Sequence, residues 1–286
     1  MNKREGRLLP RGRRRVVRLA FTVVLSTPLS LASGRQALAE FQIQEAGVEK
    51  GHVEFEYRGA YHWGVPEASA KNSNANDLVQ SHEFELQYGL TNWWLMQLTL
   101  GTEQPLHEDF NLSDVSFETE FALIKRKDDG LALSLQGGYQ KSVIGLADVL
   151  GFGPIVELAC QTMLITLNPL FTDQVGPNRD TKGIGFEYGW RAEYDFAKHW
   201  GVGLEMFGRD RRSHQCWSLQ PADHSIGPTL FWSPTEDVGD AGNGDEAEEK
   251  GAGAAPLELS LNVGVQFGLT DATSDVALKF QGSLAF

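Results

Sequence analysis

Long stretches of alternating apolar and polar residues dominate this sequence after residue 50, and they constrain its fold more than any other feature. Between residues 52 and 63, the apolar side chains of Val53 and Phe55 alternate with the charged side chains of Glu54 and Glu56, and the alternation continues for twelve residues. Successive side chains of a β-strand point to opposite faces, so this pattern predicts a strand with one apolar and one polar face. A half-buried strand of a soluble protein has about 4–8 residues. A strand that crosses a membrane needs about 9–11, so the length favours a membrane-spanning strand.

The same alternation recurs along the chain and predicts an all-β fold. The predicted strands are residues 52–63, 79–90, 94–103, 115–124, 131–140, 152–159, 163–171, 184–196, 200–209, 225–232, 257–267 and 276–286. Twelve is an even number, which places both ends of the strand array on the same side of a membrane. We therefore predict an antiparallel, up-and-down transmembrane β-barrel of about 12 strands over residues 52–286. Pro154, Pro169 and Pro228 interrupt backbone ladders, so we expect them near strand ends, edges or bulges.

The first 39 residues differ in character from the remainder. They hold nine of the 25 basic residues and one of the 38 acidic residues, followed by an apolar stretch at 19–31 and the sequence Ala37, Leu38, Ala39. This pattern is typical of a secretory signal peptide cleaved near Ala39. A membrane anchor is the alternative, but the apolar stretch is shorter than the ~20 residues of a spanning helix. We expect residues 40–51 to form a periplasmic N-terminal segment of a protein of the outer membrane.

Cleavage changes the charge that the folded protein carries. The full chain has a net charge of −13, and without residues 1–39 it has a net charge of −21. Such an acidic chain is a poor binder of nucleic acid, and none is predicted as a partner. The low mean hydropathy excludes membrane-spanning helices and is compatible with strands that carry polar residues on one face.

The polar faces of the predicted strands would line the inside of the barrel. The lumen-lining residues are predicted to be Glu54, Glu56, Arg58, Glu83, Glu85, Glu118, Glu120, Glu187, Arg191, Glu193, Glu205 and Arg209, and Glu103, Glu157, Asp195 and Lys279 lie on the same face. An aqueous, acid-lined pathway would favour cations or polar neutral solutes. The alternative is a closed interior in which Arg58, Arg191 and Arg209 bridge the carboxylates. Both interpretations remain open at the level of sequence.

Aromatic residues cluster at predicted strand ends. Trp93, Trp94, Trp200 and Trp232 fall at one end of the barrel, and the chain finishes on Phe286. Amphipathic aromatic side chains gather at both interfaces of a membrane. We therefore predict that these five residues lie at the membrane interface, in contact with outer-membrane lipids.

The connections between strands also carry information. The loops at 64–77, 102–113, 172–183 and 210–223 are long and are predicted to lie outside the cell, and the basic residues of 209–223 could contact lipopolysaccharide phosphates. Residues 233–256 contain seven acidic residues and many glycines, which indicates a flexible acidic turn. The two cysteines, Cys160 and Cys216, fall at opposite ends of the predicted barrel and are therefore expected to be unbridged.

A family resemblance adds to this interpretation. The last strand, with Leu278, Phe280, Gly282, Leu284 and Phe286 at alternate positions, resembles the signal that the barrel-assembly machinery reads in Gram-negative outer-membrane proteins. The chain as a whole resembles the putative outer-membrane transporter family associated with the meta-pathway of phenol degradation. The segments that carry this resemblance are residues 83–91 with Trp94, 153–154, 194–200, 224–228 and 267–271. The resemblance implies an outer-membrane barrel that transports small molecules, with aromatic compounds among the candidate cargoes.

The sequence predicts a channel and provides no catalytic arrangement. His224 and Ser225 are the nearest approach to a hydrolase pair, and adjacent strand residues point to opposite faces. We therefore expect a passive outer-membrane channel or transporter for small polar, cationic or aromatic solutes, without a cofactor or metal. The alternative is a closed structural or binding barrel that acts through its outer loops.

Overall fold

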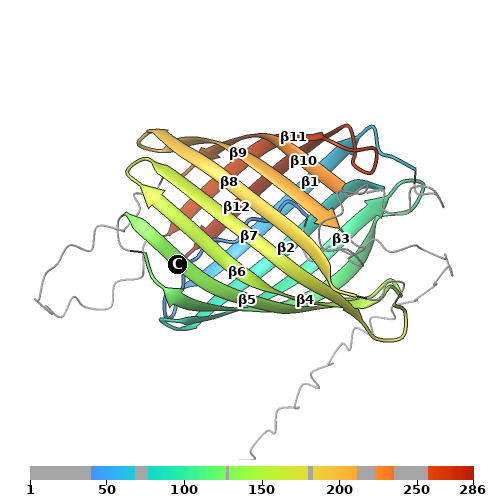
Figure 1. The fold of residues 1–286 in the computed structure, drawn as a ribbon, viewed down its shortest axis with the longest axis horizontal. Helices are drawn as coiled ribbons and strands as arrows, with labels where there is room; N and C mark the ends of the chain where they lie inside the picture. Colours follow the sequence, from blue (N-terminus) through green and yellow to red (C-terminus); the bar gives the residue numbers. More distant parts are fainter. Residues whose placement is uncertain (1–39, 68–76, 127–128, 180–182, 211–222, 235–256) are drawn as a thin grey trace, which may run out of the picture. The chain divides into compact units, whose positions relative to one another are not determined.

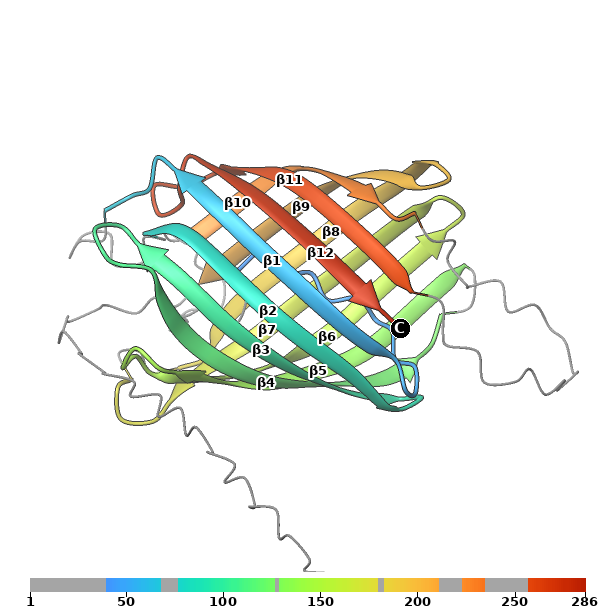
Figure 2. The same ribbon diagram turned by 180° about the vertical axis from the view of Figure 1, so that it is seen from behind.

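The described strands form a closed barrel. The computed structural model describes residues 40–67, 77–126, 129–179, 183–210, 223–234 and 257–286. Within these ranges twelve antiparallel strands pair in chain order, and β1 closes the ring against β12 (Figure 1, Figure 2). This confirms the predicted fold class. None of the described residues belongs to a helix that is long and apolar enough to span a membrane.

The strands are 10 to 14 residues long, which is the length that a tilted strand needs to cross a bilayer. Their bounds are β1 Val53–Trp63, β2 Leu78–Thr91, β3 Trp94–Pro105, β4 Asn111–Ile124, β5 Gly130–Ser142, β6 Asp148–Cys160, β7 Met163–Val175, β8 Gly185–Ala197, β9 Trp200–Asp210, β10 Asp223–Trp232, β11 Glu258–Gly268 and β12 Val276–Ala285.

The pairing of β1 with β12 closes the barrel over its full height. The register runs from Glu54 opposite Ala285 to Trp63 opposite Val276. Two further hydrogen bonds of 3.0 Å join the backbones of Val53 and Phe286 in both directions. The predicted interface residue Phe286 therefore extends the closing ladder by one pair, and its side chain is exposed. Closure leaves no unpaired sheet edge, which a barrel in a membrane requires.

The two faces of the wall have opposite chemistry. The outward side chains are large and apolar, and many are exposed, among them Phe55, Leu86 and Phe152. Inward positions hold charged and polar side chains that are buried, among them Glu85 and Glu205, which are 1% exposed. This inverted arrangement suits a wall with hydrocarbon outside and polar groups inside.

The structure extends several strands beyond the ranges predicted from alternation. β4 begins at Asn111 instead of residue 115, β6 begins at Asp148 instead of 152, and β7 ends at Val175 instead of 171. These extra residues lie toward the long loops, where polar side chains occur on both faces and the alternation is lost. Backbone pairing continues there because it does not depend on side-chain polarity.

The prolines lie where the ladders are interrupted, as the sequence indicates. Between the pairs Phe152 with Phe171 and Val156 with Leu167, β6 and β7 have no paired residues, and Pro154 and Pro169 fall in this gap. Pro228 falls in the corresponding gap between β10 and β11. A proline lacks a backbone donor, so it relaxes the ladder at both places.

The two ends of the barrel differ in their connections. One end carries short turns after β2, β4, β6 and β8 and also the C-terminus, and we call it the short-turn end (Figure 1). The opposite end, which carries the connections after β1, β3, β5, β7, β9 and β11, is called the long-loop end. Residues 1–39, 211–222 and 235–256 are outside the described residues, so the signal peptide, most of the basic loop with Cys216, and most of the acidic turn remain predictions. Cys160 is free and exposed at the end of β6.

The predicted interface tryptophans gather at the short-turn end. Trp93 and Trp94 stack on each other and on Phe121, with ring centroids 6.0–6.2 Å apart. Trp200 and Trp232 are paired across β9 and β10, with ring centroids 6.2 Å apart. Two aromatic clusters thus mark this end of the wall. Their position at the lipid headgroups stays a prediction.

At Gly227 on β10, the backbones of two neighbouring strands approach each other closely. A Cβ at this position would overlap the carbonyl oxygen of Val265 on β11. We predict that Gly227→Val lowers the free energy of unfolding by about 1–3 kcal/mol, because the backbone must move to admit the side chain. Thermal or urea unfolding in detergent micelles measures this.

The matched control is Gly137→Val on β5, where an added Cβ meets only one atom, the carbonyl oxygen of Gly151, at 3.7 Å. This substitution should leave stability nearly unchanged. Equal effects of the two substitutions would contradict the close approach of β10 and β11.

Candidate functional site

The chain that precedes β1 occupies the lumen. We call residues 40–52 the lumen plug, because their hydrogen bonds reach the inner faces of strands on several sides of the barrel. In Figure 2 this segment is the blue trace inside the ring of strands, leading to β1. It contains no strand or helix. Ile43 and Val48 are its most buried side chains, at 9% and 5% exposed.

The plug is fixed first at the short-turn end. The backbone N–H of Gly51 donates to the carbonyl of Gly89 at 2.8 Å, and the Gly89 N–H donates to the carbonyl of His52 at 2.9 Å. Gly89 is required here, because a Cβ would overlap the carbonyl oxygen of Glu49. Lys125 Nζ donates to the Val48 carbonyl at 2.7 Å. These contacts turn the chain from the start of β1 into the barrel.

Polar side chains of the wall hold the middle of the plug. Asn168 on β7 accepts from the Gln44 N–H through Oδ1 at 2.5 Å and donates to the Gln44 carbonyl through Nδ2 at 3.0 Å. The Ala46 N–H donates to Glu157 Oε1 on β6 at 2.9 Å. On the opposite side, Gln44 Nε2 donates to Gln97 Oε1 on β3 at 3.2 Å. The wall thus supplies hydrogen bonds that the plug backbone lacks, since it is not in a ladder.

The far end of the plug reaches the long-loop end. Glu40 accepts a hydrogen bond from Ser81 Oγ and lies 3.3 Å from His62 Nε2. The Phe41 ring stacks on His62, with centroids 5.6 Å apart, and meets Phe207 edge-on at 5.2 Å. The plug therefore extends along the lumen from one end of the barrel to the other.

This position differs from the periplasmic location that we expected for residues 40–51. Alternation of apolar and polar residues identifies the strands of the wall. It cannot identify an irregular segment that is held by side chains of those strands, so the position of the plug was not predicted. The one available signal was composition. Gln42, Gln44 and Glu45 are polar and suit a polar lumen, whereas a membrane-facing segment would be apolar.

Arg58 compensates the charge of several carboxylates on the inner face of the wall. Arg58 on β1 pairs with Glu56 through Nη1, with Glu83 through Nη2 at 2.6 Å, and with Glu85 through Nη1 at 2.9 Å. Arg58 is 6% exposed and Glu85 is 1% exposed. Gln42 of the plug donates to Glu85 at 3.3 Å, so the plug belongs to the same network. This is the bridging arrangement that one of our two interpretations predicts.

Two further basic side chains repeat the pattern. Arg191 on β8 pairs with Glu45 of the plug and, through Nε at 3.3 Å, with Glu193. Lys279 on β12 pairs with Glu205 on β9. Glu45 lies outside the strands, and the neighbouring Arg191 guanidinium holds the pKa of its carboxyl below the ordinary value. The plug therefore contributes charge to the lumen as well as bulk.

The remaining predicted lumen residues occupy three places. Glu54 lies 3.6 Å from His52 near the short-turn end. Glu120 is 6% exposed and is paired with Gln136 across the β4–β5 ladder. Glu118, Glu187 and Arg209 line a cavity beside the plug. All twelve side chains are on the inner side, and whether solutes pass them stays a prediction.

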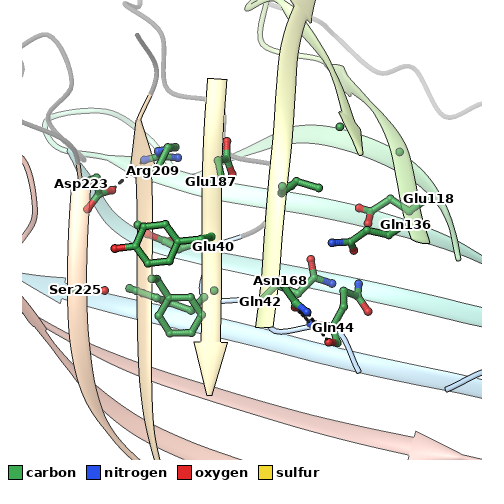
Figure 3. Close-up of a pocket in the computed structure, with 18 of the residues that line it drawn as sticks. Glu40, Gln42, Gln44, Glu118, Gln136, Asn168, Glu187, Arg209, Asp223 and Ser225 are labelled. Carbon is green, nitrogen blue, oxygen red and sulfur yellow. Dashed lines mark hydrogen bonds and ion pairs between the residues drawn. The ribbon is translucent and has the colours of Figure 1, made fainter. Parts of the chain in front are cut away.

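The cavity has a volume of about 100 Å³ and lies between the plug and the wall (Figure 3). Figure 3 shows Glu118 and Gln136 on one side of it, and Glu187, Arg209 and Asp223 on the other. Arg209 Nη2 pairs with Asp223 Oδ2 at 3.0 Å. Asp223 and Asn168 were absent from our predicted site, because β7 and β10 have weak alternation.

The pair that we considered for catalysis is divided between the two faces. His224 accepts or donates a 3.0 Å hydrogen bond with the hydroxyl of Tyr188 on the outer face, while Ser225 is 4% exposed and lines the cavity. Across the described ranges, no group of three or more His, Cys, Asp or Glu side chains is placed to hold a metal ion.

Comparison with known proteins identifies the fold and leaves the family open. No family model matches the chain, and no curated protein matches it, so the resemblance to the phenol-degradation transporter family stays a prediction. An outer-membrane channel from Pseudomonas putida F1 is similar over 86% of this chain and 100% of its own, with a TM-score of 0.54 and 8% identity.

Two further solved structures match the chain with lower TM-scores. The KdgM porin covers 82% of this chain and 98% of its own, with a TM-score of 0.46 and 8% identity. LpxR from Salmonella typhimurium covers 82% and 99%, with a TM-score of 0.39 and 9% identity. At these identities the likeness concerns the fold alone.

Arg58 provides a direct test of charge compensation. We predict that Arg58→Met lowers the free energy of unfolding by about 3–5 kcal/mol, because the carboxylates of Glu56, Glu83 and Glu85, two of them buried, lose their cation. Adding Glu83→Gln and Glu85→Gln to this variant should restore much of the loss. Unfolding in detergent micelles is the measurement, and Arg179→Met, at an exposed position, is the control. If the triple variant were no more stable than Arg58→Met, charge compensation would not be the role of Arg58.

Glu45 should make the attachment of the plug sensitive to acid. Its pKa in the folded protein is lowered by Arg191, so the ion pair contributes fully above the ordinary carboxyl value of about 4.3. The contribution is lost as the pH falls through the lowered value. We predict that hydrogen-exchange protection factors of plug amides drop between pH 7 and pH 3, and drop less in Glu45→Gln.

The control for this measurement is Glu49→Gln, since Glu49 is an exposed glutamate of the same segment. It should keep the full pH response of the unmodified protein. An unchanged response in Glu45→Gln would show that the Arg191 pair does not hold the plug.

Proposed function

We propose that this protein is a passive channel of the outer membrane, for small polar, cationic or aromatic solutes, and that the lumen plug sets its conductance. Solutes would cross the acid-lined lumen along their gradients, without a cofactor and without a catalytic step. The exposed apolar side chains on the outer face and the aromatic clusters at the short-turn end support the membrane location. The basic leader at residues 1–39 supports export.

The proposal depends mainly on how the plug is held inside the lumen. The lumen is filled by a segment without secondary structure, held by individual hydrogen bonds and by the Glu45–Arg191 ion pair to side chains of the wall. Each such hydrogen bond contributes about 0.5–1.5 kcal/mol net. The wall itself is held by backbone ladders on both sides of every strand. The plug can therefore move while the wall stays closed.

The far end of the plug carries local strain that favours movement. Phe41 has a φ of 54°, in the left-handed region that is costly for an aromatic residue. Such conformations cost about 1–3 kcal/mol and persist because surrounding contacts impose them. Here the imposing contacts are the rings of His62 and Phe207. Release of Phe41 would relieve the strain and open the lumen from the long-loop end.

The sign of the charge supports a preference for cations. The sequence predicts twelve acidic and four basic residues on the inner face of the strands, Asp223 on β10 also lines the cavity, and the plug contributes Glu40, Glu45 and Glu49 against Lys50. The ion pairs neutralise part of the excess, and the remainder leaves the lumen negative. Rings of carboxylates favour cations in channels.

The competing function is a closed barrel that acts through its outer loops. The Arg58 network favours it, because bridged carboxylates make a rigid interior. Conductance separates the two functions. A channel conducts when the plug moves, and a closed barrel does not conduct in any state of the plug.

The decisive experiment locks the plug to the wall. In a Cys160→Ser, Cys216→Ser background, we introduce Ile43→Cys and Gly189→Cys. A Cβ at Gly189 would lie 3.2 Å from Ile43 Cγ1, which matches the spacing between a Cβ and the partner sulfur of a disulfide. In planar bilayers the reduced protein should conduct, with a reversal potential that shows cation preference, and the oxidised protein should fall to background.

The single-cysteine variants should conduct equally under oxidising and reducing conditions. Folded, reduced protein that conducts no ions at neutral or acidic pH would contradict the channel. Equal conductance in the oxidised and reduced states would contradict the role of the plug.

A further inference from the structure

We propose that the lumen binds a small organic ammonium ion against Glu118, in the space between the plug and strands β4 and β5. This assigns a substrate class to the proposed channel and in that sense rests on the proposed function. The binding itself needs only the folded barrel, so it is measured separately from conduction.

The space is of molecular size. The cavity beside the plug measures about 100 Å³, and a second one of about 30 Å³ lies next to it, with Glu40 lining both. An apolar cavity of about 150 Å³ admits benzene. The larger cavity is therefore suited to a ligand of about four non-hydrogen atoms. The absence of a side chain at Gly138 contributes to the space, because a Cβ there would come within 2.6 Å of Glu118 Cγ.

Glu118 is a carboxylate beside the cavity that forms no ion pair with a described basic side chain. Asp223 is paired with Arg209, and Glu40 contacts His62 and Ser81. Glu118 accepts one long hydrogen bond, 3.3 Å from Ser116 Oγ, and within the described ranges no basic side chain forms an ion pair with it. A carboxylate in a restricted space is stabilised by a cation that reaches it.

Two glutamines of β5 frame Glu118. Gln136, Gly138 and Gln140 are successive inward positions of this strand, and Gly138 is paired with Glu118 across the ladder. Gln136 lines the larger cavity and Gln140 the smaller one. Gln140 is 3% exposed, and its Oε1 atom has no hydrogen-bond partner in the described part of the chain. This buried acceptor requires a donor, which gives evidence for a ligand that is independent of the charge.

The Glu118 carboxylate and the Gln140 amide oxygen together favour one chemical class of ligand. A carboxylate and a buried amide oxygen both accept hydrogen bonds, so the ligand must donate several and carry positive charge. An ammonium group has three donors. A metal ion is disfavoured, since no described group of His, Cys, Asp or Glu side chains has the arrangement to hold one. The apolar part of the ligand would contact Phe41 and Phe207, which also line the cavity.

The test is a direct binding measurement on the mature full-length protein in detergent micelles, by isothermal titration calorimetry. The probes are ethanolamine, its neutral isostere ethylene glycol, and the anion glycolate. We expect saturable binding of ethanolamine alone. Glu118→Gln, which keeps the shape and removes the charge, should raise the dissociation constant about tenfold or more, as expected for loss of a charge-assisted hydrogen bond.

A matched variant controls for the overall negative charge of the lumen. Glu54→Gln removes an inward carboxylate of β1 that lines neither cavity, and it should leave the dissociation constant unchanged. Gln136→Leu should weaken binding without a change in net charge. Folding of each variant is verified by its thermal unfolding, and Glu118→Gln is expected to fold because Glu118 bridges no cation.

The outcomes separate this inference from the proposed channel. Equal binding of ethanolamine and ethylene glycol, or equal binding to the unmodified protein and Glu118→Gln, would overturn the ammonium site. Cation conduction without any ethanolamine binding also overturns the ammonium site, but it is consistent with the proposed channel. Ethanolamine binding that depends on Glu118, in a barrel that never conducts, supports the site and contradicts the channel.

Discussion

Closure of the strand ring by β1 and β12 is the constraint on which the other features of this structure depend. Every backbone donor and acceptor of a membrane-spanning wall must be paired within the protein. Continuous pairing from Glu54 to Trp63 satisfies this at the junction of the first and last strands. With the ring closed, alternation assigns each side chain to one of two environments. The exterior becomes apolar, and the polar residues of twelve strands face a confined interior.

Confinement of so many carboxylates creates the second constraint, which is charge compensation. Arg58, Arg191, Arg209 and Lys279 each pair with one or more acidic side chains. The plug completes the arrangement, since its Gln42 side chain donates to Glu85 and its Ala46 N–H donates to Glu157. A wall that is polar inside thus recruits its own N-terminal segment as a partner. The excess of carboxylates beside the plug is the part left over, and it is where the proposed cation pathway and ammonium site lie.

The wall was predictable from the sequence and the plug was not. Alternation is a local property, so residues such as Glu83 and Glu85 reveal their face from their immediate neighbours. Strand ends such as Asn111 and Asp148 were missed, because pairing extends beyond the alternating residues. The plug contacts Gln97, Glu157 and Asn168, which are 53 to 124 residues away in sequence. No periodicity encodes contacts of this kind, and the same reason explains why the cavity residues Asn168 and Asp223 were not grouped beforehand.

The direct covalent connection between the plug and β1 has a consequence for competition. A segment joined to its binding site by a short connection acts as if present at a millimolar concentration or more. Gly51 and His52, the last residues of the plug, lead directly into β1 and are hydrogen-bonded to Gly89 at the short-turn end. Any solute that displaces the plug must therefore compete against this local concentration, as must a free peptide with the same sequence. A solute at low concentration would pass only if a small part of the plug has to move for it. The covalent attachment of the plug to β1 would thus set a minimum solute concentration for entry.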